Sequence, residues 1–437
     1  SGDPREGIRA LSITDISKTI LDANAHWPRR VESLLFADEG GTIRYFETRD
    51  DLFAWIQERM GLFWENGQDD ADSRSLVSRA EFMSHLQAMT RKYAAVEEMP
   101  HEPPMEGHYY AWKAPSDYKA TGEYLNKLVS FFDNVESESD FWLAKAALMT
   151  PAWGGLPGKR PAFVIMAPDR GCGKSTLANA IGHLYGGHIE LQLTDSAEDK
   201  LTSRLLTPSS LSKRVVRIDN IKESYNSAFI EGLITAPTIS GHRLYYGDAN
   251  RPNTLTFIMT GNALRLSRDI AERSFIIRLA KPEYHAGWES DVFNYVSTNR
   301  QRILADIIAE LKKQPERTAA DDRYADWVKE VLAQSGGEPD AIVALNKERR
   351  AFCDDDQDEA MTIMAAIDAH VDSIAVLETH VFVASSQMTN IVSTALNEYL
   401  SAKAVKAKLE SHIEAGRLDR VQWKRTSAQN GYSIRRR

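Results

Sequence analysis

The chain has 437 residues, of which 43% are apolar and 26% are charged, and this composition is typical of a globular protein with room for two to four domains. No apolar run approaches the ~18–20 residues that a membrane-spanning helix needs, so we expect no membrane partner. The net charge of −9, from 53 basic and 62 acidic residues, argues against a protein that covers duplex DNA with one broad basic face. It is compatible with a narrow basic pore or with one small basic domain.

Cysteine and histidine give little sign of a disulfide or of a metal centre. Cys172 lies in a glycine-rich loop, so a structural disulfide with Cys353 is not expected, and this cysteine usage fits a reducing cytoplasm. His101 and His108 flank a segment with prolines, which prevents a helical histidine pair. The chain begins with a Ser-Gly pair and not with Met. We interpret the pair as a cloning remnant and expect a fragment of a longer protein.

The first region, residues 1–112, has the pattern of an α+β segment. Apolar periodicity predicts helices, and a Glu-Gly-Gly turn lies between two short strand patterns. The predicted helices lie at 13–23, 50–60 and 78–93, and the predicted strands at 33–36 and 42–46. A proline-rich stretch at 100–105 marks the boundary.

The second region, residues 113–285, alternates apolar strands with helices, which predicts an α/β fold with a largely parallel sheet. Two helices, at 118–133 and 140–149, lead into this core. The predicted strands lie at 162–166, 215–218, 255–260 and 274–279, and a helix at 175–185 follows the first of them.

The last two regions differ from each other in their predicted secondary structure. Residues 286–376 are helical, with helices predicted at 291–313, 324–334 and 360–371. In residues 377–437, two helices at 387–400 and 403–415 precede short strands at 420–424 and 432–436, which is the order of a winged-helix-like domain. The charge is uneven here, since an acidic cluster at 354–359 precedes a basic tail that starts at Lys403.

The clearest motif begins where the strand at 162–166 ends. The segment PDRGCGKST, residues 168–176, matches the phosphate-loop pattern G-x-x-x-x-G-K-[ST], with Pro168 in place of the first glycine. Such a loop surrounds the phosphates of ATP with backbone N–H groups and a helix N-terminus, and Lys174 would reach the β- and γ-phosphates. The Ser175 hydroxyl would bind Mg²⁺. The residues expected around the nucleotide are Asp169, Arg170, Gly171, Cys172, Gly173, Lys174, Ser175 and Thr176.

A second strand, 215–218, ends in Asp219. A carboxylate at the end of an apolar strand is the other half of a phosphate-loop site, where it binds Mg²⁺ together with Ser175. The acid that often follows is replaced by Asn220, so Asp219 itself or Glu223 would orient the attacking water.

The segment LTFIMTGN, residues 255–262, places Asn262 at the end of a third strand, where its amide would contact the γ-phosphate and the attacking water. Arg273 follows eleven residues later, and a guanidinium beside a transferring phosphoryl group stabilises its charge. We favour Arg273 for this role over Arg268 and Arg278. A plain turn at Asn262 and a surface ion pair at Arg273 are the structural alternatives.

Residues 240–253, SGHRLYYGDANRPN, predict a hairpin with its turn at 247–250. Its side chains would either bind a nucleic-acid backbone and stack on bases, or pack inward, and the residues alone favour neither. The residues concerned are His242, Arg243, Tyr245, Tyr246 and Arg251.

Together, the phosphate loop, the IDN strand, the hairpin, the TGN strand and the segment RDIAERSFIIRL resemble superfamily 3 helicases and related AAA+ replication ATPases. The likeness covers roughly 105–335, and the helicase modules of phage and mobile-element primase–helicase proteins are the most similar group. It implies a P-loop AAA+-like core that uses ATP and Mg²⁺, and a homo-oligomeric ring, usually a hexamer. Arg273 would act from the neighbouring subunit.

The resemblance also implies partners and a location. The hairpin would line a central pore and pull single-stranded DNA, with Arg251 or His242 in place of the tip lysine that the family often has. A primase domain upstream, or a primase partner, and the cytoplasm of a bacterial host belong to the same expectation. By position, residues 1–112 would be a collar or a DNA-binding region.

Three functions follow as hypotheses. The first is an ATP-driven replicative DNA helicase or translocase. The second is a nucleotide-switched origin-binding or loading ATPase without unwinding activity. It would contact phosphates through basic residues of the tail, namely Lys403, Lys406, Lys408, Arg417, Arg420, Lys424 and Arg425. The third is a small-molecule kinase, which would need neither Asn262, Arg273 nor the basic tail.

Overall fold

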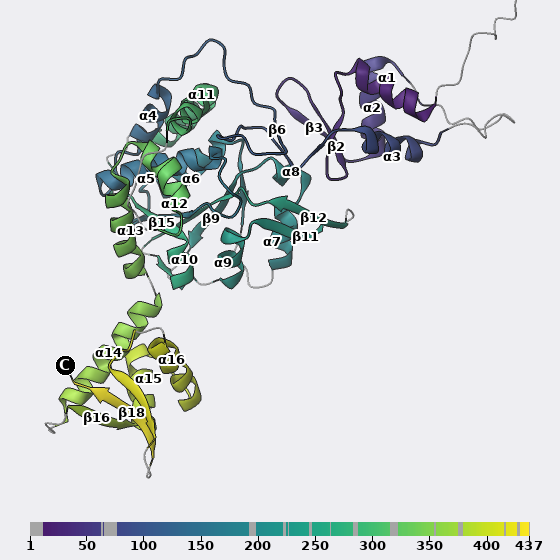
Figure 1. The fold of residues 1–437 in the computed structure, drawn as a ribbon. Helices are drawn as coiled ribbons and strands as arrows, with labels where there is room; N and C mark the ends of the chain where they lie inside the picture. Colours follow the sequence, from purple (N-terminus) through teal and green to yellow (C-terminus); the bar gives the residue numbers. More distant parts are fainter. Residues whose placement is uncertain are drawn as a thin grey trace, which may run out of the picture.

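The computed structural model describes residues 12–62, 64, 77–191, 198–221, 224–225, 227–243, 247–262, 264–282, 287–314, 322–353, 355–374, 379–414, 417–425 and 429–436. Figure 1 shows an N-terminal part, a large central core and a smaller C-terminal body that hangs from the core on one helical connection. No helix among these residues is long and apolar enough to cross a membrane.

The N-terminal part is a small sheet with helices against it. Its strands follow the order β3-β2-β1-β4, in which β1 is parallel to β4 and antiparallel to β2. The elements are α1 (Ile13–Ala23), β1 (Arg29–Val31), β2 (Leu34–Asp38), β3 (Ile43–Phe46), α2 (Arg49–Met60), α3 (Arg79–Met89) and β4 (Lys92–Tyr93). The predicted helix at 78–93 is too long, because Thr90 is extended and the following residues form β4.

The core is built on a five-stranded parallel sheet in the order β15-β7-β13-β9-β8. Its strands are β7 (Ala162–Ala167), β8 (His188–Glu190), β9 (Val215–Ile221), β13 (Thr256–Asn262) and β15 (Ser274–Arg278). The α/β class and the four predicted strands are thereby confirmed. The three-residue β8 was not predicted, since so short a segment carries no periodic signal.

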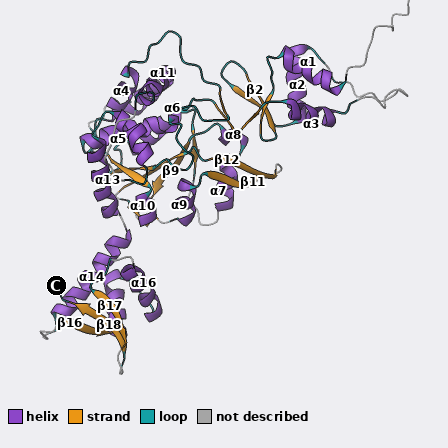
Figure 2. Ribbon diagram, in the orientation of Figure 1, coloured by secondary structure: helices purple, strands orange, loops and turns teal. Residues whose placement is uncertain are grey.

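Both faces of this sheet are buried. Phe163 and Ile165 of β7 pack into one apolar cluster, and Val164 and Met166 pack into another on the opposite face. Figure 2 shows helices on both sides of the strands. This burial explains why the strands read as continuous apolar runs with no polar alternation.

One face is covered by helices that precede and follow the sheet in sequence, together with α6, which lies between β7 and β8. They are α4 (Glu123–Val129) with a 3-10 turn (Ser130–Phe132), α5 (Glu138–Met149) with a 3-10 turn (Thr150–Ala152), α6 (Lys174–Leu184), α11 (Trp288–Leu311) and α12 (Ala325–Trp327). The predicted helix at 324–334 is broken, because α12 continues as a π-helical turn (Val328–Leu332) and then a 3-10 turn (Ala333–Ser335).

The other face is covered by segments inserted between the strands. These are α7 (Glu198–Leu205), α8 (Pro208–Leu211), β10 (Ser224–Tyr225), α9 (Ala228–Thr235), β11 (Thr238–Arg243), β12 (Gly247–Pro252), β14 (Arg265–Leu266) and α10 (Arg268–Glu272). The parallel pair β5 (Ala95–Glu97) and β6 (His108–Tyr110) connects the N-terminal part to the core.

The free edge of β15 is covered by α13 (Pro339–Cys353), a helix that we did not predict. Side chains of α13 form hydrogen bonds with backbone groups of β15 that a sixth strand would otherwise pair with. Asn346 Oδ1 accepts from the Ile276 amide at 2.6 Å, and the Arg350 guanidinium donates to the Ser274 carbonyl at 2.8 Å. Saturating the backbone groups of an edge strand in this way prevents pairing with another chain.

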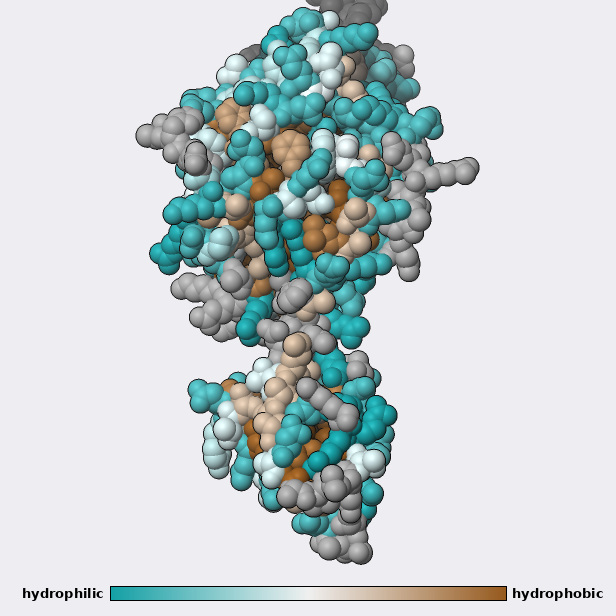
Figure 3. All heavy atoms as spheres, turned by 90° about the vertical axis from the view of Figure 1, so that its left-hand side faces the viewer, coloured by the Kyte–Doolittle hydropathy of each residue, from teal (hydrophilic) through white to brown (hydrophobic). Residues whose placement is uncertain are grey.

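The C-terminal body has its own core. It contains α14 (Asp355–Asp372), β16 (His380–Ala384), α15 (Ser385–Leu396), α16 (Ala402–Glu414), β17 (Val421–Arg425) and β18 (Asn430–Arg435), with the antiparallel sheet order β16-β18-β17. Ile363 and Ile367 of α14 lie in the same apolar cluster as Val383 and Leu409. The boundary predicted at 377 therefore separates a helix from the core into which it packs. Figure 3 shows this body below the core, joined to it by a narrow neck.

Candidate nucleotide site

The loop between β7 and α6 has the backbone of an anion site. Gly171 and Gly173 adopt positive φ angles of 78° and 85°, a conformation that side chains disfavour, and they bracket the buried Cys172. Gly173 is also the N-cap of α6 and has no side chain with which to cap the helix. The amides of the first turn therefore point toward the loop, where a phosphate would accept from them.

Lys174 is the first residue of α6. Its Nζ donates to the carbonyl oxygen of Asp169 at 2.9 Å, so the amine lies folded back over the loop. Partial burial lowers the pKa of Lys174, and the nearby Cys172, Asp169 and Asp219 offset this only in part. An anion placed between the lysine and the loop amides would stabilise the charged amine.

Ser175 and Asp219 are brought together as the sequence predicted. Ser175 Oγ donates to Asp219 Oδ1 at 3.0 Å, and both residues lie at the carboxyl edge of the parallel sheet, after β7 and near the end of β9. A hydroxyl beside a carboxylate is the oxygen pair that Mg²⁺ prefers. Among the described residues, no group of three or more His, Cys, Asp or Glu side chains could hold a metal. A magnesium ion here would take its further ligands from phosphate oxygens and water.

Thr260 was missed by sequence reasoning. The pairing of β9 with β13 is interrupted between Met259 and Gly261, and Thr260 lies at this bulge. Its hydroxyl donates to Asp219 Oδ1 and accepts from the Asn220 amide at 3.1 Å. The one signal in the sequence is a hydroxyl residue inside an otherwise apolar strand.

The backbone conformation at position 220 explains why asparagine occupies a position where an acidic residue is usual. Its φ angle is +57°, in the left-handed region that asparagine tolerates better than most residues. The bulge turns the backbone here and leaves Asp219 facing Ser175. Glu223, the other proposed orienter of water, lies outside the described residues.

Asn262 is the exposed last residue of β13, and it pairs with Ala167 at the end of β7. It thus lies at the same edge of the sheet as the phosphate loop. A cleft of about 420 Å³ opens beside this loop, lined by Ala167, Pro168, Glu136 and residues 278–281. Pro168, which replaces the first glycine of the phosphate-loop pattern, borders this cleft.

Arg273 lies at the opposite edge. It is the C-cap of α10, and its carbonyl accepts from the amide of Ala162, the first residue of β7. The length of β7, about 17 Å at 3.3 Å per residue, separates Arg273 from the phosphate loop. Its guanidinium is bound to Asp269 at 2.9 Å and its side chain is 15% exposed. Arg273 therefore does not belong to the site formed by Lys174.

The hairpin exists, but its turn is not where we predicted it. Residues 247–250 lie in β12 and pair with β11, in a register that sets Arg243 opposite Gly247. The register is fixed by burial, because Ala249 and Arg251 face the protein interior. The connection between the two strands, residues 244–246, lies outside the described residues, and Tyr245 and Tyr246 belong to it. The side chain of Arg243 is likewise outside the described part of the structure.

Arg251 does not belong to the DNA-contacting set. Its side chain is buried, and its guanidinium donates to the carbonyls of Leu205, Ser210 and Lys213 at 3.3, 2.8 and 3.1 Å. It holds the hairpin on α7 and α8. His242 is exposed on β11, and its carbonyl accepts from Ser203 at 2.9 Å.

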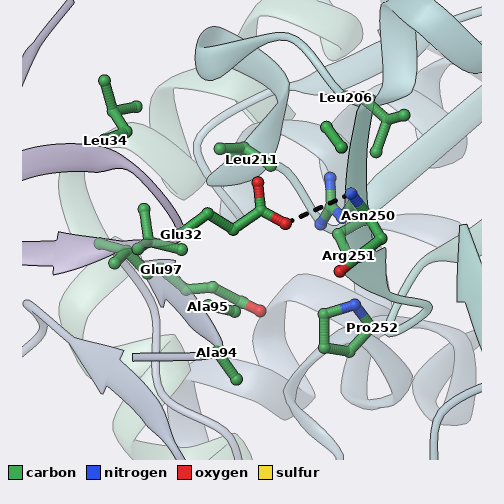
Figure 4. A pocket seen from close by; sticks show the side chains of 13 residues that line it. Glu32, Leu34, Ala94, Ala95, Glu97, Leu206, Leu211, Asn250, Arg251 and Pro252 are labelled. Atoms are coloured by element: carbon green, nitrogen blue, oxygen red, sulfur yellow. Dashed lines mark hydrogen bonds between the residues drawn. The ribbon is translucent and has the colours of Figure 1, made fainter. Parts of the chain in front are cut away.

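The base of the hairpin also contacts the N-terminal part. Figure 4 shows a small pocket between the two, where Glu32 accepts from the Asn250 amide at 3.3 Å. Glu32, Ala95 and Leu34 line one side, and Leu206 and Pro252 line the other. The N-terminal part is thus packed against strand β12 and not only linked to the core by the chain.

Comparison with known proteins supports the fold. No protein-family model and no curated protein sequence matches the chain. The solved apo C-terminal region of NrS-1 matches 98% of this chain and 100% of its own length, with 13% identity and a TM-score of 0.54. A second apo structure of that region gives 13% identity and a TM-score of 0.53, over 96% of this chain and 98% of its own. JCV helicase matches 53% of this chain and 68% of its own length at 15% identity, but the TM-score of 0.28 is too low to support an argument.

Proposed function

We propose that this protein is an ATP-dependent replicative DNA helicase or translocase of the phage or mobile-element type, which acts as a ring of the hexameric kind that the motifs imply. The observation that carries the proposal is the division of the site residues between two edges of one sheet. Lys174, Ser175, Asp219 and Asn262 lie at the carboxyl edge, and Arg273 lies at the amino edge.

ATP fits the carboxyl edge. Its phosphates would accept from the loop amides and from Lys174, which would exchange the Asp169 carbonyl for phosphate oxygens. Ser175 and Asp219 would hold Mg²⁺, which neutralises charge on the phosphates when it is bound. The adenine ring of ATP would enter the cleft beside Pro168. Asn262, at the end of the strand between β7 and β9, would contact the γ-phosphate and the attacking water.

Arg273 completes the site only if a second subunit supplies it. A guanidinium about one strand length from its own phosphate loop cannot stabilise charge there, but it can reach the loop of a neighbour in a ring. Within its subunit, Arg273 is held by Asp269, and the Tyr324 hydroxyl donates to its carbonyl at 3.3 Å. A homo-oligomer, rather than a monomer, is therefore the active species.

The hairpin would carry the single-stranded DNA. It projects from the core at β11 and β12 in Figure 1, and its base is anchored by Arg251. We propose His242, Arg243, Tyr245 and Tyr246 as the contacting residues. A primase, as an upstream domain or as a partner, and the cytoplasm of a bacterial host complete the proposal.

A nucleotide-switched origin-binding or loading ATPase is the second candidate function. The observation that favours it is Asn220 in the place of an acid, since a site without a dedicated base hydrolyses ATP slowly and suits a switch. The boundary of the DNA-binding body would then lie near Asp355, where α14 begins, and the body would be winged-helix-like.

The test measures ATP hydrolysis with and without single-stranded DNA. A motor is expected to hydrolyse ATP several-fold faster with DNA, and Arg243→Ala is expected to remove the stimulation but not the basal rate. Lys329→Ala, on an exposed position of the core far along the chain from the hairpin, is the matched control.

Particle mass with a non-hydrolysable ATP analogue provides the second measurement. A ring is expected. A stable monomer, or hydrolysis that DNA leaves unchanged, would overturn the motor, and an assembly whose hydrolysis ignores DNA would favour the switch.

A further inference from the structure

The C-terminal body contains a cleft that the proposed motor does not use. It has a volume of about 500 Å³ and lies between the first turns of α15 and α16 and the strands β17 and β18. Its lining includes Lys403, Lys406, Trp423 and Tyr432.

Trp423 is the main feature of this cleft. It lies on β17 and is 38% exposed, one of the few large apolar side chains at the surface of the described residues. Its ring meets the buried Tyr432 edge-on, with centroids 5.0 Å apart at 79°, which fixes its orientation. A fixed aromatic ring that remains open to solvent is a platform on which a nucleic-acid base can stack.

A cation lies over the same ring. Lys406 Nζ is 4.6 Å from the centroid of Trp423 and also 3.5 Å from Glu410, with both charged side chains 45% exposed. Lys403 precedes it by one turn and Arg425 follows Trp423 on the same face of β17, and both are exposed. Positive charge around an aromatic ring is the combination that single-strand binding grooves use.

Two other basic residues of this body, Lys408 and Arg420, are paired within the fold. Lys408 is paired with Glu359 at 2.6 Å, and Arg420 with Asp368 at 2.7 Å, both on α14. Helix α14 thus neutralises the charges of Lys408 and Arg420 within the fold. Lys408 and Arg420 therefore serve the fold, whereas Lys403, Lys406 and Arg425 lie around Trp423 and are exposed.

The geometry favours a single strand over a duplex. In a duplex the faces of the bases are stacked on one another, and a tryptophan platform has no base face to meet. A duplex read by α16 along its length would also bring phosphates near Glu414, a carboxylate at the far end of that helix. The first turn of α15, which has no side-chain cap, borders the cleft and would add its amides to a phosphate.

We propose that this cleft is a second binding site for single-stranded nucleic acid, with a base stacked on Trp423 and phosphates beside Lys403, Lys406 and Arg425. The site does not depend on ATP or on the hairpin. It would hold a strand outside the core while the core exchanges nucleotide.

The test uses the full chain without nucleotide and a fluorescein-labelled oligodeoxythymidylate, with affinity measured by anisotropy. Trp423→Leu keeps apolar packing on Tyr432 but removes the stacking face, and it is expected to weaken binding about tenfold, within the range for loss of one stacked base. Trp423→Phe, which retains a ring, is expected to restore most of the affinity. Tyr399→Ala removes a fully exposed aromatic of the same body and is the matched control, with no change expected.

Two further measurements locate the site. Photo-crosslinking with a bromouracil-containing strand is expected to label the tryptic peptide 421–424, whether or not the core is a motor. The double variant Lys403→Ala/Lys406→Ala is expected to reduce the slope of log affinity against log salt by about 1.4, the single-strand value for two phosphate contacts.

Three results would overturn the proposal. They are crosslinks that fall only in the core, equal binding by the Leu and Phe variants, and a duplex bound more tightly than the single strand with no effect of Trp423→Leu. Loss of DNA-stimulated hydrolysis in a hairpin variant that still crosslinks at 421–424 would concern the motor and leave this site intact.

Discussion

Thr260 shows how a single hydroxyl on β13 acts on the phosphate site one strand away. Through the bulge it binds both the Asp219 carboxylate and the Asn220 amide, so it fixes the carboxylate on the side of Ser175. Groups that orient a metal-binding carboxylate are typically worth 10–100-fold in metal affinity. Thr260 is therefore a positioning residue and not a catalytic one.

Thr260→Val, which keeps the side-chain shape, is expected to raise the Mg²⁺ concentration needed for half-maximal ATP hydrolysis by about 10–100-fold. The measurement is a magnesium titration at saturating ATP. Thr260→Ser is expected to restore the wild-type midpoint, since it returns the hydroxyl.

The control for this substitution lies on the same strand. Thr256 is fully buried, and its hydroxyl has no hydrogen-bond partner, so Thr256→Val is expected to leave the magnesium midpoint unchanged. If both valine variants shift the midpoint equally, the effect comes from packing of β13 and the role assigned to Thr260 is wrong.

At the scale of single residues, motif spacing predicted the pairing of Ser175 with Asp219, and it was misleading for Arg251. The pairing follows because the carboxyl ends of neighbouring parallel strands meet at one edge. Arg251 has the same chemistry as a DNA-binding arginine. Only its position over the carbonyls that end α7 and α8 shows that its charge serves the fold.

At the scale of elements, α14 is held to the C-terminal body by a carboxylate with two partners. Glu359 accepts from His412 at 2.7 Å and from Lys408 at 2.6 Å. The hydrogen bond from His412, followed by that from Lys408, lowers the pKa of Glu359 below its usual value near 4.5. The stability that this carboxylate contributes is present above that usual value and is lost as the pH falls through the lower, folded-state pKa.

Glu359→Gln is expected to speed amide hydrogen exchange in α14 and α16 at neutral pH, because the charge-assisted bonds are lost. The difference from the wild type is expected to shrink as the pH falls below about 4.5, because the Glu359 carboxylate of the wild type becomes protonated and is then neutral like the glutamine of the variant. Hydrogen-exchange mass spectrometry at matched intrinsic rates provides the comparison. A difference that persists unchanged in acid would contradict this role of Glu359.

The hairpin shows why elements were easier to predict than their registers. A Gly-Asp pair is a good turn signal, and it placed the turn at 247–250. The buried side chains of Ala249 and Arg251 instead require these residues to be extended in β12. Burial of one face outweighs a local turn preference, because a shift by one residue would turn both side chains outward.

At the scale of the whole molecule, a buried charge joins the N-terminal part to the core. The Arg214 guanidinium at the start of β9 binds the Glu97 carboxylate of β5, and it donates to the carbonyls of Pro100 and Pro151 at 2.5 and 3.0 Å. Both side chains are about 1% exposed. His101 and His108 lie beside this pair, and burial lowers the pKa of each.

Glu97→Gln is expected to destabilise the junction by about 3–5 kcal/mol, because the Arg214 charge would remain buried without its partner. The measurement is the urea midpoint of the transition in which the core unfolds. Glu98→Gln alters a neighbouring, half-buried carboxylate and is expected to change the midpoint little. Equal effects of the two substitutions would show that the ion pair is not what joins the two parts.

The assembly itself is tested by mixing two inactive proteins. Lys174→Ala and Arg273→Ala are each expected to abolish hydrolysis. An equimolar mixture is expected to regain activity at roughly a quarter of its interfaces, those that combine an intact lysine with the neighbour's intact arginine. Arg268→Ala, one turn earlier on α10 and paired with Glu272, is the control and is expected to stay active. Mixtures that remain inactive would place Arg273 outside the site.

Local signals in the sequence were enough to predict the α/β class, four of the five strands of the core sheet, and the placement of Ser175 beside Asp219 at its carboxyl edge. Apolar runs and the phosphate-loop spacing are local signals, and parallel strands bring their ends together whatever the details of packing. The sequence could not show that Thr260 orients Asp219, that Arg251 is buried, or that α14 belongs to the C-terminal body. These were decided by contacts between segments far apart in the chain, where burial and charge pairing outweigh local preference. The distance between Arg273 and Lys174 was also decided by the sheet, because the backbone of Arg273 bonds to the first residue of β7 whereas Lys174 follows its last residue.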